Sequence, residues 1–298
     1  MIIVRFTGGL GNQMFQYALG RNLALKNNTW LKIDTSILFD RSQAHEIVTH
    51  RNLDIDIFNV RLESATDKEI EYFNGKKYAS IPGKIYNKIG WTFRKKNLIV
   101  ENGRQFDSAI LQLGDNKCLV GSWQSEKYFR EAESYIRKEY TFKAPLSGKA
   151  EELGKQIAQP NTLCVNVRRG DYVTSPIYSK TLGAMPLEYF QKGYEAIKAK
   201  TSISKTFIFS DDIEWCRQNL NFFKDATLVE HEYAGPKFST YLHLMSLCNH
   251  FIIPNSTFGW WGAWLANRSG KIVIAPKSWY KDPTLNSSDI VPAGWIKL

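Results

Sequence analysis

At the start of this sequence, short apolar segments typical of strands alternate with a segment whose apolar residues recur at helical spacing. Residues 2–7 are apolar and end at Gly8-Gly9, and residues 12–26 then carry apolar side chains at helical spacing. Residues 30–34 are again strand-like. A strand, a turn, a helix and a second strand in this order are typical of a parallel sheet with helices on its faces.

The same pattern restarts after residues 144–148, whose composition suits a linker. The sequence therefore predicts an α/β fold of two doubly wound, Rossmann-like domains, residues 1–147 and 148–298, that face each other across a cleft. Ligands of such domains collect at the carboxyl ends of the strands. The later predicted strands are residues 118–121, 163–167, 206–210, 227–230, 250–254 and 272–276, and the helices are residues 127–140, 149–158, 186–200, 240–247, 259–266 and a further one from residue 213.

Positive charge is concentrated in one segment. The formal net charge is +10, and residues 76–96 contain seven basic side chains and no acidic one, with aromatic residues interleaved. Such a segment suits an anionic partner, either a membrane surface, a phosphate-bearing acceptor or nucleic acid, and a solvated basic face is the alternative. The basic residues are Lys76, Lys77, Lys84, Lys88, Arg94, Lys95 and Lys96.

Cysteine spacing and hydropathy indicate the cellular compartment in which we expect this protein. The four cysteines lie far apart without a CxxC pair, so we expect them to be free in a reducing compartment. The first residues read as a strand and not as a secretory signal. Residues 251–266 are apolar but interrupted, so they fall short of the roughly 18 apolar residues of a membrane span. We therefore expect a cytoplasmic protein, with peripheral contact at the inner face of the membrane as an open alternative.

The loop after the first strand, residues 8–13, combines glycines with two amides. Glycines let the backbone approach a ligand closely, and the start of a helix offers free N–H groups to an anion. A tight structural turn explains the glycines equally well. Asn12 and Gln13 exceed what a helix cap requires, and amides suit the recognition of hydroxyl and phosphate groups. We therefore predict that Gly11, Asn12 and Gln13 lie at a ligand.

Two adjacent arginines, Arg168 and Arg169, follow the predicted strand at residues 163–167. Neighbouring side chains of an extended chain point to opposite sides, so one arginine can reach a ligand while the other folds back, with Asp171 as its candidate partner. A guanidinium matches phosphate oxygens and keeps its charge. Sugar transfer from a nucleoside diphosphate needs such a cation, because negative charge builds on the leaving pyrophosphate. An ion pair at a strand end is the structural alternative.

Two further predicted strand ends carry small polar residues. Asn255, Ser256 and Thr257 precede a tryptophan-rich helix, and they could cap this helix or hold a diphosphate. The tryptophans favour a core position over a sugar platform. Ser210, Asp211 and Asp212 could bind a metal, cap the next helix or accept hydrogen bonds from a nucleoside, and we favour the last two.

Metal-binding patterns are weak in this sequence. Asp54-Ile55-Asp56 resembles the DxD signature of metal-dependent glycosyltransferases, but it lies in residues 53–58, whose alternation predicts a strand with one acidic face. The five histidines show no metal-ligand spacing. We therefore expect neither a metal ion nor another cofactor.

Together these loops resemble the bacterial α-1,2-fucosyltransferases of glycosyltransferase family 11, which are inverting and use GDP-fucose. The resemblance spans most of the chain in the expected order. The matching runs are GGLGNQMFQYALG (residues 8–20), GSWQSEKYF (121–129), VNVRRGDYV (165–173), FSDD (209–212), HLMSLCNHFIIPNSTFGWWGAWLA (243–266) and KIVIAPKSW (271–279).

This resemblance implies a GT-B architecture, in which the second domain holds most of the donor without a metal ion. It implies that Arg168 contacts the pyrophosphate, while Arg169 and Asp171 organise their loop. Asn12 would reach the donor across the cleft. The residues implied to lie near the GDP are Asp211, Asp212, Asn255, Ser256 and Thr257.

Two positions depart from the family pattern. Asn166 stands where a histidine usually begins the arginine motif, and Gly259 stands where serine is frequent. Because an amide is not a general base at neutral pH, we expect the catalytic base to lie elsewhere, or proton loss to be late and weakly assisted.

The leading hypothesis is transfer of L-fucose from GDP-fucose to the 2-hydroxyl of a terminal β-galactoside, forming an α-1,2 link in a glycan such as O-antigen. The acceptor would be a galactose-terminated oligosaccharide or a lipid-linked glycan, and no nucleic-acid partner is expected. The alternative is a non-catalytic binder of anionic polymers or lipids through residues 76–96.

Overall fold

The computed structural model describes residues 1–42, 51–74 and 97–298, which divide into two compact units, Met1–Thr141 and Phe142–Leu298. The sequence placed the division six residues later, after Ser147. Phe142 stacks on His243 with 4.2 Å between ring centroids, and the Leu146 side chain lies against Gly154. Residues 142–147 therefore pack with the second unit and do not form a free linker.

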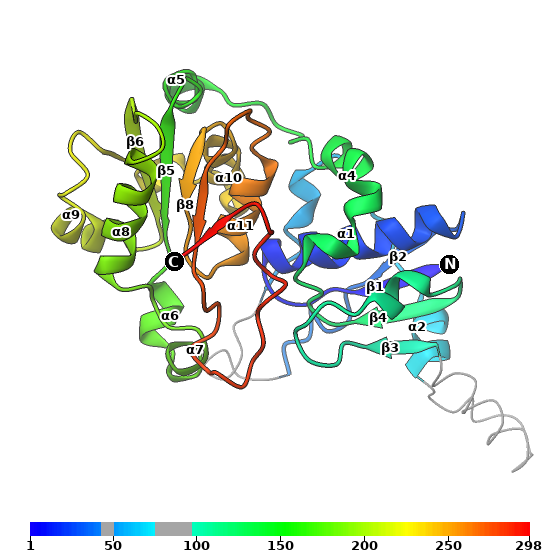
Figure 1. Ribbon diagram of the computed structural model, residues 1–298. Coiled ribbons are helices and arrows are strands. Elements are labelled where there is room, and N and C mark those ends of the chain that lie inside the picture. The colour runs from blue at the N-terminus through cyan, green and yellow to red at the C-terminus, as the bar shows by residue number, and fades with distance from the viewer. Residues whose placement is uncertain (43–50, 75–96) are drawn as a thin grey trace, which may run out of the picture. The chain divides into compact units, whose positions relative to one another are not determined.

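The first unit is built around a parallel sheet in the order β2-β1-β4-β3 (Figure 1). Apolar β1 is fully buried, and Gly20 lets the helix α1 approach it, because a Cβ there would lie 2.3 Å from the Val4 side chain. The elements are β1 (Ile2–Arg5), α1 (Leu10–Lys26), β2 (Leu31–Asp34), α2 (Asp67–Asn74), β3 (Leu98–Val100), β4 (Lys117–Val120) and α4 (Glu133–Glu139).

The second unit has a parallel sheet in the order β10-β9-β8-β5-β6-β7. The strands are β5 (Thr162–Val167), β6 (Lys205–Ser210), β7 (Thr227–Leu228), β8 (His250–Ile252), β9 (Val273–Ala275) and β10 (Ile296–Lys297). The helices are α5 (Gly148–Ile157), α6 (Gly170–Thr174), α7 (Pro176–Thr181), α8 (Leu187–Lys198), α9 (Ile213–Asn219), α10 (Ser239–Ser246) and α11 (Thr257–Leu265). The α/β class and the two Rossmann-like parallel sheets are confirmed, while the cleft between them stays a prediction.

Alternation along β5 distributes its side chains between two layers of helices. Leu163, Val165 and Val167 pack in one core with residues of α8 and α9. Asn166 points to the opposite face, where it meets Gly259 of α11. Figure 1 shows α8 and α9 on one side of this sheet and α10 and α11 on the other. The period of two in a strand therefore decides which helix each residue of β5 contacts.

Two sequence predictions of regular structure are wrong. Residues 53–58 do not form a strand: Ile55–Ile57 is a 3-10 turn. Residues 127–140 do not form one helix, because two 3-10 turns, Glu126–Tyr128 and Arg130–Ala132, precede α4. At residues 53–58 a distant side chain overrides the local alternation, because the N–H groups of Asp54 and Ile55 donate to Gln13 Oε1.

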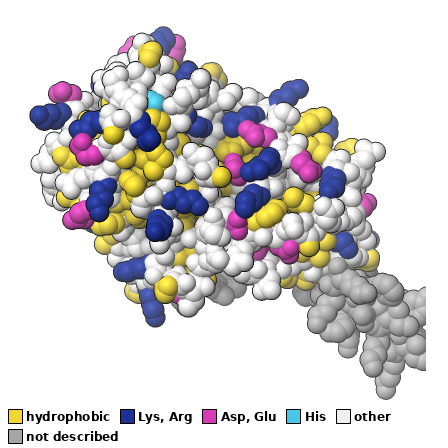
Figure 2. Space-filling model, viewed as in Figure 1, with side chains coloured by type: hydrophobic (Ala, Val, Ile, Leu, Met, Phe, Trp, Pro, Cys, Tyr) yellow, Lys and Arg dark blue, Asp and Glu magenta, His cyan; other side chains and the backbone are white. Residues whose placement is uncertain are grey.

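The surface of the described residues mixes charges of both signs. On the face in Figure 2, lysine and arginine side chains are scattered among acidic and apolar ones. The basic segment at residues 76–96 lies outside the described residues, so its predicted anionic partner stays a prediction. Within residues 1–42, 51–74 and 97–298, no helix has both the length and the apolar character needed to cross a membrane.

Candidate functional site

The second unit brings three of the predicted loops to one edge of its sheet, those after β5, β6 and β8. The chain runs outward from β5 through β6 and β7 and then returns to β8 on the other side of β5, so the strand order reverses between β5 and β8. Ligands of doubly wound sheets bind at the carboxyl ends of the strands at such a reversal. Arg168 directly follows β5, and Asn255 follows β8.

Arg168 is held between two carboxylates. Its Nη2 donates to Asp171 Oδ1 at 2.6 Å, and its Nη1 lies 2.8 Å from Asp211 Oδ2. Burial opposes the charge, but the carboxylates of Asp211 and Asp171 outweigh it and raise the pKa of the Arg168 guanidinium. The side chain keeps 30% of its surface exposed, so it is fixed in direction and still accessible to a ligand.

Arg169 is anchored on the neighbouring loop. Its Nε donates to Asp212 Oδ2 at 3.1 Å, and its guanidinium carbon stands 4.1 Å from the centre of the Trp215 ring. The sequence suggested that the arginine that folds back pairs with Asp171. This is corrected by the structure, because Asp171 binds Arg168, the arginine predicted to contact the ligand. Arg169 organises the loop through Asp212 and Trp215 instead.

The loop after β6 supports both arginines. Asp211 Oδ1 accepts from the Arg169 backbone N–H at 2.8 Å while Oδ2 faces Arg168. Asp212 Oδ1 caps α9 by accepting from Trp215 N at 3.1 Å, as expected for a cap. Ser210 is buried, and its hydroxyl accepts from the Asp212 N–H. Any contact of Asp211 and Asp212 with a nucleoside stays a prediction.

Asn255 has a structural task that the sequence did not reveal. Its Nδ2 lies within hydrogen-bond distance of the carbonyls of Leu182, Gly183 and Trp279, at 3.0, 3.2 and 3.1 Å. Only 2% of the residue is exposed. Asn255 therefore ties the loop before α8 to the loop after β9. Its Nδ2 is thus engaged with these carbonyls, while the predicted position of Asn255 near the GDP stays a prediction.

The start of α11 remains suited to an anion. Ser256 is its N-cap but makes no side-chain capping bond, and Thr257 is partly exposed. The first N–H groups of a helix have no intrahelical acceptor, and the helix dipole places positive potential there. The tryptophans of α11, Trp260, Trp261 and Trp264, are buried, so their predicted core role is confirmed.

The two departures from the family pattern are neighbours in space. Asn166 is buried, and its Nδ2 donates to the Phe209 carbonyl of β6 at 3.2 Å. Its Oδ1 would stand only 2.5 Å from a Cβ on Gly259. A side chain at position 259 therefore requires the Asn166 amide to shift.

A double-mutant cycle tests this steric coupling. Gly259→Ala alone is expected to cost about 1–3 kcal/mol in stability, because the new methyl group overpacks against Asn166. The same substitution in an Asn166→Ala background should cost less, since the colliding amide is gone. Stabilities from urea unfolding give the coupling, and strictly additive effects would contradict the contact.

In the first unit, the loop after β1 meets the loop after β4. Gly8 adopts a φ of +74°, and a Cβ there would lie 2.3 Å from Asn12 Nδ2, so this turn requires glycine. Asn12 Oδ1 accepts from Gln124 Nε2 at 2.9 Å, and Asn12 remains partly exposed. Gly11 is buried in the first turn of α1. Asn12 and Gln124 are thus partly exposed amides at this edge of the sheet.

Gln13 is fully buried and belongs to the framework. Its Oε1 accepts from the N–H groups of Asp54 and Ile55, and its Nε2 donates to the carbonyls of Gly8 and Asn52. These bonds shape the 3-10 turn at Ile55–Ile57, which explains why the predicted strand does not form. The prediction that Gln13 lies at a ligand is therefore corrected.

Cation-binding groups are not assembled in the described ranges. No cluster of three or more His, Cys, Asp or Glu side chains with metal-site geometry occurs within residues 1–42, 51–74 and 97–298. Asp54 is the N-cap of the 3-10 turn, and Asp56 lies within it. The expectation of a metal-independent reaction stays a prediction.

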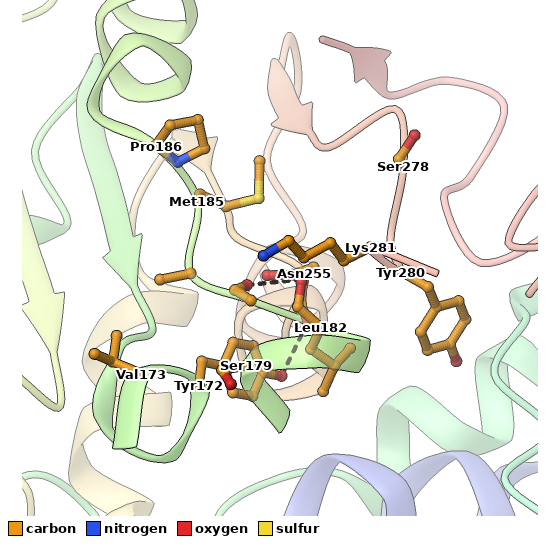
Figure 3. A pocket seen from close by; sticks show the side chains of 12 residues that line it. Tyr172, Val173, Ser179, Leu182, Met185, Pro186, Asn255, Ser278, Tyr280 and Lys281 are labelled. Carbon is orange, nitrogen blue, oxygen red and sulfur yellow. Dashed lines mark hydrogen bonds between the residues drawn. The ribbon is translucent and has the colours of Figure 1, made fainter. Parts of the chain in front are cut away.

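Sequence reasoning missed a pocket beside Arg168 (Figure 3). Tyr172 connects the two, since it lines the pocket and its ring centre stands 5.5 Å from the Arg168 guanidinium carbon. Asn255 lies in the wall, and Lys281 reaches across the space above it. The pocket measures about 460 Å³. No motif marked Lys281, because its loop meets this site only in the folded chain.

Comparison with known proteins shows which sequences and folds this chain resembles. The sequence model described as glycosyl transferase family 11 matches residues 1–298. The chain is 31% identical to an Escherichia coli α-1,2-colitosyltransferase, over 100% of this chain and 99% of the relative. It is also 31% identical to the Escherichia coli O-antigen biosynthesis glycosyltransferase WbnK, over 98% of each.

More distant similarities agree with these. A Bos taurus galactoside 2-α-L-fucosyltransferase, SEC1, is 27% identical over 88% of this chain and 63% of the relative. The crystal structure of the fucosyltransferase NodZ from Bradyrhizobium superposes with a TM-score of 0.51 at 16% identity, covering 92% of this chain and 94% of NodZ. That structural likeness concerns the fold, which is the GT-B type.

Proposed function

Because this chain belongs to glycosyl transferase family 11, we propose that it transfers L-fucose from GDP-fucose to the 2-hydroxyl of a terminal β-galactoside, with inversion and without a metal ion. The observation that carries the proposal is the position of Arg168. It stands at the reversal of strand order between β5 and β8, pre-oriented by Asp171 and Asp211.

The proposed reaction breaks the bond between the anomeric carbon of fucose and the diphosphate oxygen. The bonding electrons leave with GDP, and the 2-hydroxyl of the acceptor attacks the opposite face of the sugar. Arg168 and the amino-terminal end of α11 would oppose the charge that grows on the leaving diphosphate. The acceptor proton goes to a base other than Asn166, whose amide is bonded to Phe209 and has no basic character.

A second donor is favoured by one specific observation, the 31% identity over the whole chain to a colitosyltransferase. Colitose differs from L-fucose by lacking the 3-hydroxyl group. A site that hydrogen-bonds this hydroxyl rejects the deoxy sugar strongly, whereas a site that leaves it free does not. Comparing kcat/KM for GDP-fucose and GDP-colitose with the same acceptor decides between the two donors.

The test of the proposal uses the purified full chain with GDP-fucose, lactose and EDTA. We expect fucosylated lactose whose NMR spectrum shows an α-1,2 link, and we expect the rate to be insensitive to EDTA. Activity that EDTA abolishes and manganese restores would overturn the metal-independent mechanism. Absence of transfer to every β-galactoside tested, with GDP-colitose as well as GDP-fucose, would overturn the proposed function.

The similarity to WbnK supports an O-antigen or related surface glycan as the product. The competing hypothesis, a non-catalytic binder of anionic polymers, is not favoured, because the family match covers the whole chain. Membrane contact through residues 76–96 stays a prediction. Reversing Lys76, Lys77, Lys95 and Lys96 to glutamate should abolish sedimentation with anionic liposomes and leave the activity on lactose unchanged.

A further inference from the structure

The charged side chains around Arg168 do not carry a net positive charge. Arg168 and Arg169 are matched by three carboxylates, Asp171, Asp211 and Asp212, all within ion-pair distance of one of the two guanidinium groups. This cluster therefore has a net charge of −1. Tyr172 contributes no charge, because burial raises the pKa of its hydroxyl. A diphosphate that approaches the cluster needs positive charge from another group.

The pocket beside the cluster contains such a group, Lys281. Figure 3 shows its side chain extending over Asn255, with the amine toward the interior of the pocket. The residue is exposed, and its ammonium has no carboxylate partner among the residues that the structure describes. The nearby carboxylate of Asp282 is bonded to Thr284 instead.

The backbone that carries Lys281 is held in place from two sides. The Lys281 N–H donates to the Thr181 carbonyl at 2.8 Å, and Asn255 Nδ2 donates to the Trp279 carbonyl two residues earlier. The stem of the side chain lies against Gly183, where a Cβ would stand 3.3 Å from Lys281 Cδ. The position of the stem is therefore constrained, while the charged end stays available.

The pocket borders the arginine site at Tyr172. Its ring lies beside the Arg168 guanidinium, and its hydroxyl donates to the Asn255 carbonyl at 3.1 Å. Asn255 follows β8 and Arg168 follows β5, so the pocket lies at the same reversal of strand order as the arginine. A phosphate group held by Lys281 would therefore lie at the same edge of the sheet as Arg168.

We propose that this pocket receives the phosphate-bearing end of the sugar-nucleotide donor, and that Lys281 supplies the positive charge that the arginine cluster lacks. The proposal rests on the proposed function for the identity of the donor. With Lys281 included, the site becomes electrically balanced before the donor binds. The helix dipole of α11 then acts on the diphosphate without opposition from an excess of carboxylates.

Isothermal titration with GDP, guanosine and inorganic pyrophosphate tests this assignment in Lys281→Gln and in a matched control, Lys200→Gln. Lys200 is an exposed lysine that follows the C-cap of α8, in the connection that leads to the start of β6. We expect Lys281→Gln to weaken GDP and pyrophosphate by about tenfold, as for loss of a charge-assisted hydrogen bond, and to leave guanosine unchanged. Lys200→Gln should match the wild type, and Lys281→Arg should restore most of the GDP affinity.

Two further measurements, salt dependence and acceptor kinetics, show whether Lys281 binds the diphosphate of the donor or the phosphate of an acceptor. The affinity of GDP should fall less steeply with salt in Lys281→Gln than in the wild type, since one charge contact is missing. Unchanged GDP affinity together with unchanged kcat would overturn the proposal. So would a variant that turns over neutral lactose normally but shows a raised KM only for a phosphate-bearing acceptor. Both results leave the proposed function intact, whereas absence of all transfer with normal GDP binding affects the proposed function alone.

Discussion

Replacing Arg168 with alanine is expected to lower kcat by about 10²–10³-fold, in the range seen when one group that stabilises a developing anion is removed. Two effects contribute. The leaving diphosphate loses its guanidinium contact. In addition, Asp171 and Asp211 lose the cation between them, so that Arg169 alone faces three carboxylates at this edge of the sheet. The second effect makes the loss larger than that of an ordinary phosphate contact.

Steady-state kinetics with GDP-fucose and lactose measure the change, and thermal unfolding shows whether the variant is folded. Arg168→Lys keeps the charge but cannot bridge two carboxylates as a planar guanidinium does, so intermediate activity is expected. Arg217→Ala is the control, because Arg217 is an exposed arginine of the same unit that pairs with Glu230. Wild-type turnover in a folded Arg168→Ala protein would contradict the role in departure of the diphosphate.

Asn255→Asp is expected to destabilise the second unit strongly. It places a carboxylate oxygen where an amide now faces three backbone carbonyls. Each buried carbonyl that loses its donor costs about 1–3 kcal/mol, so a total loss of at least about 3 kcal/mol is expected. Activity should fall as well, because the loop before α8 and the loop after β9 form the walls of the pocket beside Arg168.

The pH dependence of this loss has a definite sign. Burial among carbonyls raises the pKa of the introduced carboxyl above its unfolded value of about 3.9. A group whose pKa is raised on folding favours the folded state at low pH and opposes it as pH rises. The stability deficit of Asn255→Asp relative to the wild type should therefore grow as pH increases above about 4.

Urea unfolding across this pH range measures the deficit, with Asn286→Asp as a matched control. Asn286 is exposed, and its Oδ1 accepts from the Ser288 N–H, a bond that a carboxylate also makes. This control should unfold like the wild type. A deficit of Asn255→Asp that stays constant or shrinks with rising pH would show that the side chain does not face the three carbonyls.

Much of the fold could be predicted because it depends on local patterns. Apolar runs with a period of two or of 3.6 identify β1, α1, β5 and β6 to within a few residues. The predictions that were wrong depend on distant partners. The alternation at residues 53–58 suggested a strand. Instead, the N–H groups of Asp54 and Ile55 donate to Gln13 Oε1, some forty residues earlier, and these bonds hold the segment in a turn.

The candidate site shows the same difference between what local patterns predict and what distant partners decide. The loops at the strand ends could be predicted, because a parallel sheet brings the carboxyl ends of its strands to one edge. Which side chain in a loop faces a ligand could not. Arg168 stays accessible because Asp171 and Asp211 hold it there, whereas Gln13 and Asn255 turn inward to carbonyls from other segments.

The sequence by itself therefore determined the family, the α/β class and most strands and helices of the second unit, and it predicted the loops in which the chemistry would lie. Only the tertiary structure decided the partners of each polar group, the negative balance of the arginine cluster and the position of Lys281 beside it. The physical reason is that hydropathy and glycine placement act over a few residues. A hydrogen bond or an ion pair, in contrast, depends on which distant atoms the folded chain brings within about 3 Å.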